Sequence, residues 1–517
     1  MFTRIFLFLT LLSANVQAQT DAMYRDLPMG NHPIGFKIVT FTDPSRVTKP
    51  LVNYYGEKET GDRSRKISVH LWYPAKVKTG NGTVTYGEYA FNDLRTTTTE
   101  TVAENRRIGK LNSQRASFEG FFGKISDEQW QAITNTPMRA QRDAKYSGEN
   151  FPLLIGMLRP LSTAVTNEML ASNGYVVAMI KHSGARYPLG YIEEIQDMQL
   201  AIHVINQLGI IDAEKIGTFG FSGSGFTQVA FAMQDPRILA LADLESGFFM
   251  DGLFQQISSS NYYNAQRLRI PFLHLFGTDA SREEVHIGEF EKLRYSDRYR
   301  VILNQKKLHH WDFATEGRAS TSVVNIRGDR EEGIRMAYEV ANYYLLNFFD
   351  AILKKGISSD VLSSTPNWAK TYPDSVHTFQ YLPALKAPPD KNEFISIVNR
   401  NGIDKAIVLA RELWKQDTLA EILHENMLNL MAQDFRREER RTDALAMQKF
   451  ATELHPKKAW LWNNLASLQE DFGFPEDAIK CSETVLELLA DFTGSELSFN
   501  ERIRRSSEAR LKRLKGL

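Results

Sequence analysis

The stretch "KIGTFGFSGSGF", residues 215–226, determines how the rest of the chain is interpreted. Its first half is rich in β-forming residues, and a helical pattern follows its glycines. Ser222 therefore lies at a tight corner between a predicted strand and a predicted helix. One interpretation is a nucleophile elbow, in which a sharp turn exposes a serine hydroxyl. The other is an ordinary glycine-rich loop.

Length and composition limit the classes of protein to consider. With 517 residues, 43% of them hydrophobic, the chain is long enough for one large domain and a second unit. The 62 basic and 62 acidic residues balance, so there is no charge signature of nucleic-acid binding. Cys481 is the single cysteine, which excludes an internal disulfide, and we interpret it as a small core residue.

Residues 1–18 have the pattern of a secretory signal peptide. A short basic start precedes the apolar run 5–12, and Val16-Gln17-Ala18 resembles a cleavage site. The run is well below the ~20 residues that span a bilayer. No cysteine comes directly after the expected cleavage site, so the acceptor of a bacterial lipoprotein anchor is missing. We expect cleavage after Ala18, a periplasmic or extracellular protein and no membrane span.

Predicted strands and helices organise residues 19–388 as an α/β domain. Two antiparallel strands are expected at 35–41 and 66–73, and strands alternate with helices from Phe151 onward. This alternation predicts a mainly parallel sheet covered on both faces. The polar segment 76–150 interrupts the pattern, and we interpret it as a variable insertion, for which a lid is one role.

Residues 389–517 are predicted to be helical throughout, and they contain an internal repeat. "DALAMQKFATEL" from Asp443 and "DAIKCSETVLEL" from Asp477 are 34 residues apart, with a weaker copy at 402–413. This period resembles tetratricopeptide repeats, with a plain helical bundle as the alternative. Helical repeats present concave surfaces, so a protein or peptide partner is expected here.

The elbow interpretation requires a histidine that takes the serine proton and a carboxylate that orients the histidine. His309 and His310, in "KKLHHWDF", follow the last predicted strand of the α/β domain and are the candidates for the base. Ser222 itself follows a predicted strand and opens a predicted helix, which is the context of the motif. Ser224 replaces the usual second glycine and is still small. These observations favour the elbow over the ordinary loop.

Residues 30–355 resemble the platelet-activating-factor acetylhydrolase group of α/β-hydrolases. The motifs that carry the resemblance are "HPIGFKIV", "RKISVHLWYPA", "LASNGYVVAMIKH", "GFSGSG", "DPRILALADLESG" and "LHHWDF". The resemblance implies an α/β-hydrolase fold and a serine hydrolase of carboxylic esters. It assigns the nucleophile to Ser222, the acid to Glu245 and the base to His310, without a cofactor.

The chain departs from the family pattern in two places. The acid is usually aspartate, whereas this position is Glu245. The segment 156–161, "GMLRPL", replaces the usual His-Gly, which contributes one of two N–H donors to the oxyanion. Gly223 supplies the other donor, and the neighbour that replaces the missing one is left open. Asp279 competes with Glu245, because it follows the strand where most α/β-hydrolases carry their acid.

The leading hypothesis is an esterase that forms an acyl-enzyme on Ser222. A non-catalytic hydrolase-like scaffold, whose helical repeats bind a partner, is the alternative from a different class. An amidase or lactonase with the same triad is a third hypothesis. No group of histidines, cysteines and carboxylates has metal-ligand spacing, so neither a metal nor an organic cofactor is expected. The acyl group, the alcohol and the oligomeric state are left open.

Overall fold

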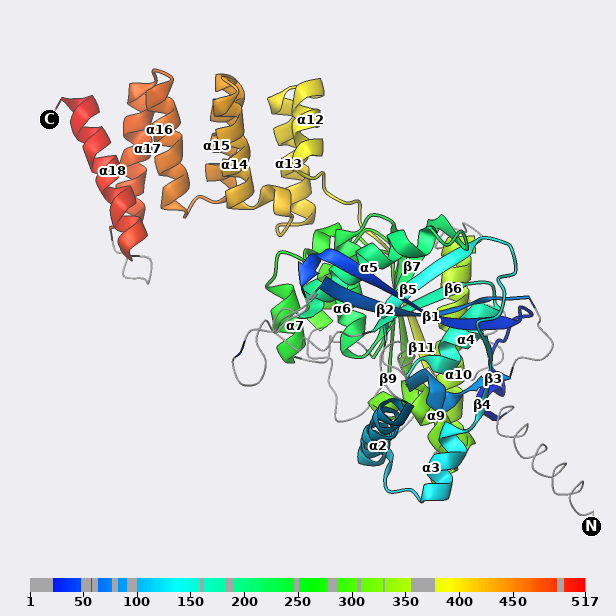
Figure 1. Cartoon of the computed structure of the whole chain (residues 1–517). Coiled ribbons are helices and arrows are strands. Elements are labelled where there is room, and N and C mark those ends of the chain that lie inside the picture. The colour runs from blue at the N-terminus through cyan, green and yellow to red at the C-terminus, as the bar shows by residue number, and fades with distance from the viewer. Residues whose placement is uncertain are drawn as a thin grey trace, which may run out of the picture. The chain divides into compact units, whose positions relative to one another are not determined.

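The computed structural model describes residues 22–47, 57, 64–76, 82–90, 100–158, 162–181, 190–245, 251–277, 287–304, 308–328, 331–354, 377–490 and 497–516. The chain divides into two compact units, Met1–Leu385 and Lys386–Leu517 (Figure 1). The expected signal peptide, Asp279 and residues 159–161 lie outside the described ranges, so the hypotheses about them remain predictions.

An 11-stranded sheet forms the centre of the first unit, within the part of the chain that the structure describes. In sheet order the strands are β11 (His377–Leu382), β10 (Arg298–Leu303), β9 (Phe272–Gly277), β8 (Ile238–Leu244), β7 (Ile211–Phe221), β5 (Phe151–Leu158), β6 (Val176–Lys181), β2 (Ser64–Pro74), β1 (Ile34–Val47), β4 (Pro137–Arg142) and β3 (Thr83–Thr85). The run from β10 to β6 is parallel throughout, whereas β1 and β2 pair antiparallel. The predicted α/β fold with a mainly parallel sheet is confirmed.

Helices bury both faces of this sheet. Leu153, Leu154 and Ile155 of β5 are all fully buried, as expected for a strand covered on two sides. Leu154 belongs to one apolar cluster, and its two neighbours belong to the other. The first cluster includes α4 (Ala164–Ser172), α9 (Thr315–Ser322) and α10 (Glu331–Phe349); the second includes α5 (Gly190–Asn206), α6 (Gly223–Gln234), α7 (Asp251–Ser258) and α8 (Ile287–Lys292).

The segment 76–150 is more than an addition to the surface. It contains the 3-10 helix η1 (Tyr86–Ala90), α2 (Glu100–Phe122) and α3 (Asp127–Thr134), together with β3 and β4. Strand β4 pairs in parallel with β1, so part of the segment extends the central sheet.

Three elements outside this segment were not predicted from the sequence patterns: strand β11 and helices α7 and α9.

A buried carboxylate anchors this segment to the sheet domain. Glu168 of α4 is fully buried and accepts hydrogen bonds from the hydroxyls of Tyr24 and Tyr89. It also accepts the backbone N–H groups of Arg139 and Ala140, at 2.9 and 3.1 Å. Burial raises the pKa of the Glu168 carboxyl, and these four donors offset the cost of removing it from water. The N-terminal turn, η1 and β4 are thereby fixed to one helix.

The second unit is helical throughout its described residues. Its helices are α12 (Lys391–Asn401), α13 (Ile403–Gln416), α14 (Glu425–Arg437), α15 (Arg441–Leu454), α16 (Ala459–Asp471), α17 (Pro475–Leu488) and α18 (Leu497–Lys515). The pair α14–α15 recurs as α16–α17 with every bound shifted by 34 residues, from 425 to 459 and from 454 to 488. Ala432 and Ala466, related by the same shift, are both fully buried. The assignment to tetratricopeptide repeats remains a prediction.

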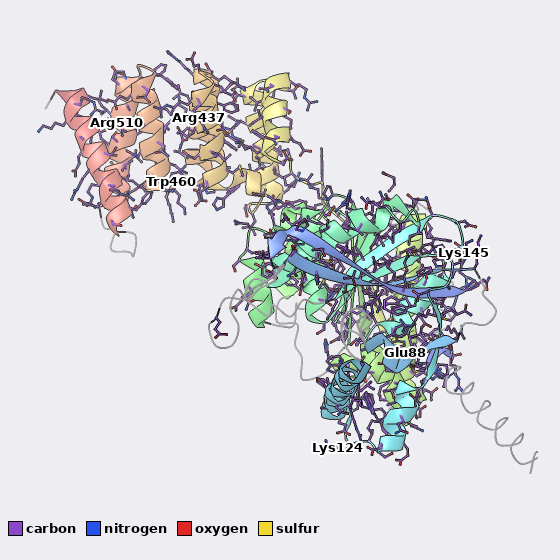
Figure 2. The ribbon with its side chains drawn as sticks, viewed as in Figure 1. Glu88, Lys124, Lys145, Arg437, Trp460 and Arg510 are labelled. Carbon is purple, nitrogen blue, oxygen red and sulfur yellow. The ribbon has the colours of Figure 1, made fainter. Side chains whose placement is uncertain are left out.

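Helix α18 closes this unit with a charged contact. The Arg510 side chain, labelled in Figure 2, is almost fully buried. It donates to the Glu470 carboxylate of α16 at 3.1 Å and to the Ser482 hydroxyl of α17 at 3.3 Å. One guanidinium therefore joins three helices.

Among the described helices of both units, none has the length and apolar character needed to cross a bilayer.

A protein that ends at Leu385 is expected to fold alone, because its sheet and both apolar clusters lie within the first unit. Circular dichroism during heating should show a cooperative loss of mixed helix and strand signal. The matched fragment, residues 386–517, should give a helical spectrum. An unfolded or aggregated 1–385 chain would show that the first unit needs the helical unit for its stability.

Candidate active site

Ser222 lies between the end of β7 and the start of α6, at the carboxyl edge of the parallel strands. Its backbone has φ 60° and ψ −138°, a conformation that non-glycine residues rarely adopt. The Ser222 N–H donates to the Leu244 carbonyl at 2.9 Å, and the Ser222 carbonyl accepts the Gly225 N–H at 2.9 Å. This is the strained strand-to-helix turn that the elbow interpretation requires.

The small residues around Ser222 are required by close backbone contact. A Cβ atom at Gly220 would lie 2.8 Å from the Gly225 nitrogen and 2.9 Å from its Cα, so a side chain does not fit there. Ser224, which replaces the second glycine of the motif, donates its hydroxyl to the Phe221 carbonyl at 2.6 Å. The serine therefore adds a hydrogen bond to the turn as well as being small.

Glu245 follows β8 directly and also has a left-handed backbone, with φ 51°. Its N–H donates to the Leu275 carbonyl at 2.8 Å. The Glu245 side chain is 4% exposed, and both of its carboxylate oxygens have polar contacts. Oε1 accepts the Gly277 N–H at 2.6 Å, and Oε2 lies 3.2 Å from His310 Nδ1. Two hydrogen-bond partners offset the cost of burying this carboxylate and fix its direction.

His310 begins the 3-10 helix η4 (His310–Phe313), which comes after β10. Its ring stacks on Phe221 with centroids 4.7 Å apart and an interplanar angle of 20°. Because Phe221 directly precedes Ser222, the imidazole lies beside the elbow. The other candidate, His309, is exposed, so the structure distinguishes the two neighbouring histidines.

A buried ion pair holds the turn that carries His310. The Asp312 carboxylate accepts the backbone N–H of His309 at 2.7 Å, and it lies 2.9 Å from the Arg327 guanidinium. Burial raises the pKa of Asp312, and the positive charge of Arg327 opposes this rise. Arg327 also lies over the ring of Phe122 on α2, 5.0 Å from its centroid. Arg327 had no sequence signal, because it belongs to no motif and meets Asp312 only in the fold.

The structure thus places Glu245 in contact with His310, and the His310 ring against Phe221, the residue before Ser222. Gly223 is the first residue of α6. In segment 156–161, the described residues Gly156, Met157 and Leu158 belong to β5. The second N–H donor is not identified among them. Among the described residues, no group of three or more histidines, cysteines and carboxylates is placed to hold a metal ion.

Comparisons with known proteins find likeness in structure alone. No family model matches the sequence, and no curated protein matches it. A ferulic acid esterase from Streptomyces cinnamoneus is 19% identical, with a TM-score of 0.47 over 68% of this chain and 98% of the esterase chain. A protein from Bacteroides ovatus described as a dipeptidyl aminopeptidase IV is 11% identical, with a TM-score of 0.34 over 63% and 36% of the two chains. We therefore take the function from the residues of the site.

Replacing Arg327 by alanine is expected to lower the free energy of unfolding by about 3–5 kcal/mol, because it leaves the Asp312 carboxylate buried without its counter-ion. Urea unfolding followed by fluorescence measures this change. Lys292→Ala is the matched control, since it removes a partly exposed ion pair with Glu289 in the same unit. That change should cost less than about 1 kcal/mol. Equal losses for the two variants would contradict the assigned role of the buried pair.

Proposed function

We propose that this protein is a serine hydrolase that cleaves carboxylic esters through an acyl-enzyme. One observation carries the proposal: Glu245 contacts Nδ1 of His310 at 3.2 Å, while the same imidazole stacks beside the elbow of Ser222. A serine hydroxyl is activated when a histidine takes its proton and a carboxylate orients that histidine, and these are the three groups found here.

The acylation step follows from this arrangement. The Nδ1–H of His310 donates a hydrogen bond to the Glu245 carboxylate, which leaves Nε2 free of a proton, so that it can accept the proton of the Ser222 hydroxyl. The serine oxygen then attacks the ester carbonyl carbon, and negative charge develops on the carbonyl oxygen. The N–H of Gly223, at the N-terminus of α6, supplies one hydrogen bond to that charge. When the tetrahedral intermediate collapses, His310 protonates the departing alcohol.

Deacylation repeats the same proton transfers with water. His310 takes a proton from a water molecule, whose oxygen attacks the acyl carbon bound to Ser222. Collapse of the second tetrahedral intermediate releases the carboxylic acid and returns the proton to the serine. The reaction consumes only ester and water, so the proposal needs no cofactor.

Backbone strain favours a catalyst over a scaffold. Ser222 and Glu245 are two of the six non-glycine residues with positive φ in the described part of the chain. Such conformations cost about 1–3 kcal/mol each, and they concentrate at functional sites. A scaffold that uses only its helical unit gains nothing from this cost. The strain therefore supports the esterase proposal.

Labelling with a fluorophosphonate tests the proposal. The probe should react covalently at Ser222, because an activated serine oxygen attacks its phosphorus, and peptide mapping should locate the adduct there. Ser222→Ala should abolish both labelling and the hydrolysis of p-nitrophenyl acetate. A folded wild-type protein that neither reacts with the probe nor hydrolyses the ester would leave the scaffold hypothesis standing instead.

The two competing carboxylates are separated by kinetics on folded variants. Glu245→Gln should lower kcat for p-nitrophenyl acetate by about 10³–10⁴-fold, because an amide at this position favours the wrong tautomer of His310. Asp279→Asn should lower kcat by less than about tenfold, a change below about 1.4 kcal/mol. Thermal melting checks that both variants remain folded. The reverse ranking would assign the acid to Asp279.

A further inference from the structure

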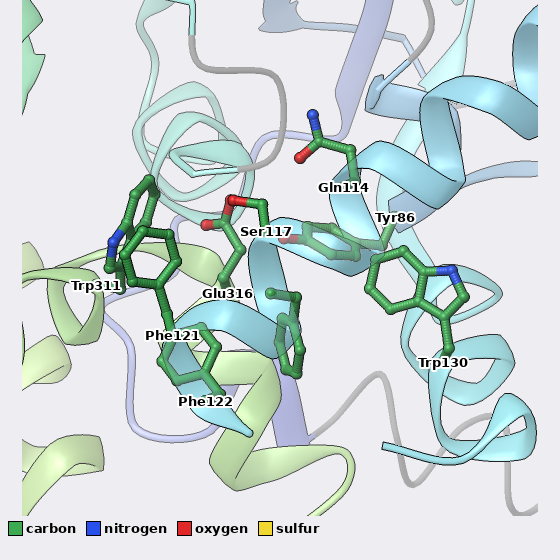
Figure 3. A pocket seen from close by; sticks show the side chains of 9 residues that line it. Tyr86, Gln114, Ser117, Phe121, Phe122, Trp130, Trp311 and Glu316 are labelled. Atoms are coloured by element: carbon green, nitrogen blue, oxygen red, sulfur yellow. The ribbon is translucent and has the colours of Figure 1, made fainter. Parts of the chain in front are cut away.

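A narrow cavity next to His310 is lined mostly by aromatic side chains (Figure 3). They come from η1, α2, α3 and η4, and they are Tyr86, Phe118, Phe121, Phe122, Trp130 and Trp311. Gln114, Ser117 and Glu316 add polar groups to the wall. Neither the esterase mechanism nor the anchoring of segment 76–150 uses this cavity.

The cavity shares a side chain with the candidate active site. Trp311 directly follows His310, and the two rings meet edge to face with centroids 5.6 Å apart. Trp311 also packs on Phe221, at 5.5 Å. Elsewhere in the lining, the Glu316 carboxylate accepts a hydrogen bond from the Ser162 hydroxyl at 3.0 Å. The cavity is therefore connected to the candidate base through Trp311.

The cavity is too small for a substrate ring in this structure. It encloses about 10 Å³, space for about one water molecule, so an aromatic ring does not fit without a side-chain movement. Phe121 is the side chain best placed to move. It is 50% exposed, and its ring lies 4.5 Å from that of Trp311. Moving a half-exposed ring away from Trp311 removes less buried apolar area than moving a core residue.

We propose that Trp311 and the aromatic side chains of α2 bind an aromatic ring in the alcohol part of the ester, which takes the place of Phe121 against Trp311. This inference rests on the proposed esterase function. His310 protonates the departing alcohol, so the alcohol oxygen lies next to the imidazole during the reaction. The ring attached to that alcohol then meets Trp311, the residue adjacent to His310.

The polar groups that line the cavity favour a substrate ring without a negative charge. The residues that line the cavity in the described part of the chain include Glu316 but no lysine or arginine. Burial raises the pKa of the Tyr86 hydroxyl, and the negative charge of Glu316 raises it further, so this hydroxyl stays protonated. A ligand carboxylate or phosphate would meet a like charge here, whereas a neutral benzyl or phenyl group is attracted by the aromatic faces.

The test compares the hydrolysis of benzyl acetate and ethyl acetate by the full-length protein, with acid release followed at constant pH. The measured quantity is the ratio of kcat/KM for the two esters. Trp311→Leu should lower this ratio about tenfold, which corresponds to about 1.4 kcal/mol, because the substrate ring loses its aromatic partner. Trp311→Phe should keep most of the ratio. A general disturbance of His310 would slow both esters and leave the ratio unchanged.

A variant at Phe121 gives an independent result, in which the ratio should change in the opposite direction. Phe121→Ala should raise the benzyl-to-ethyl ratio, because the substrate ring no longer competes with this side chain. Phe474→Ala, at a half-exposed phenylalanine of the helical unit, is the matched control and should change nothing. A ratio that falls or stays the same in Phe121→Ala would overturn the proposed exchange of rings, even if the Trp311 variants did not fold.

The outcomes separate this inference from the function on which it rests. If the wild type hydrolyses neither ester and takes up no fluorophosphonate, the esterase proposal fails. If both esters are cleaved but folded Trp311→Leu keeps the benzyl-to-ethyl ratio, the esterase proposal stands and the ring site is overturned. Methyl 3-phenylpropanoate, compared with methyl propanoate, carries the ring on the acyl side. A Trp311→Leu effect on that pair alone would also overturn the placement on the alcohol.

Discussion

The candidate site depends on hydrogen bonds between the ends of neighbouring strands, at the carboxyl edge of β7, β8 and β9. They connect Ser222 to the end of β8, and Glu245 to the end of β9 through Leu275 and Gly277. Because parallel strands end at one edge of a sheet, residues distant in sequence become neighbours there. Ser222 and Glu245 are therefore positioned by backbone groups, and of the three candidate residues only His310 depends on a loop.

The position of the histidine depends on side-chain contacts instead. The His310 ring stacks on Phe221, and the turn that carries His310 is held by the buried Asp312–Arg327 pair. Arg327 and Trp311 each contact an aromatic residue of α2, so the segment 76–150 lies against the same turn. His310 is thus the candidate site residue most directly coupled to this segment, and through it to the anchor at Glu168.

Local patterns in the sequence were sufficient to predict the sheet and the tight strand-to-helix turn at Ser222. Continuous apolar runs such as 153–155 predict buried parallel strands, and the small residues around Ser222 predict a crowded turn. The choice of Glu245 came from a resemblance, and its contact with His310 is visible only in the fold. Arg327 and the pairing of Phe121 with Trp311 had no local signature. The partners in such contacts are determined by tertiary packing. For the same reason, the sequence did not predict that part of the segment 76–150 extends the sheet.

The positive φ angles at Ser222 and Glu245 also have an evolutionary meaning. Glycine adopts this conformation at little cost, so a glycine at either position would relieve strain and favour the folded state. The chain has a serine and a glutamate where glycine is easiest to accommodate. On the esterase proposal, these two positions exchange part of the stability of the fold for the side chains that the chemistry needs.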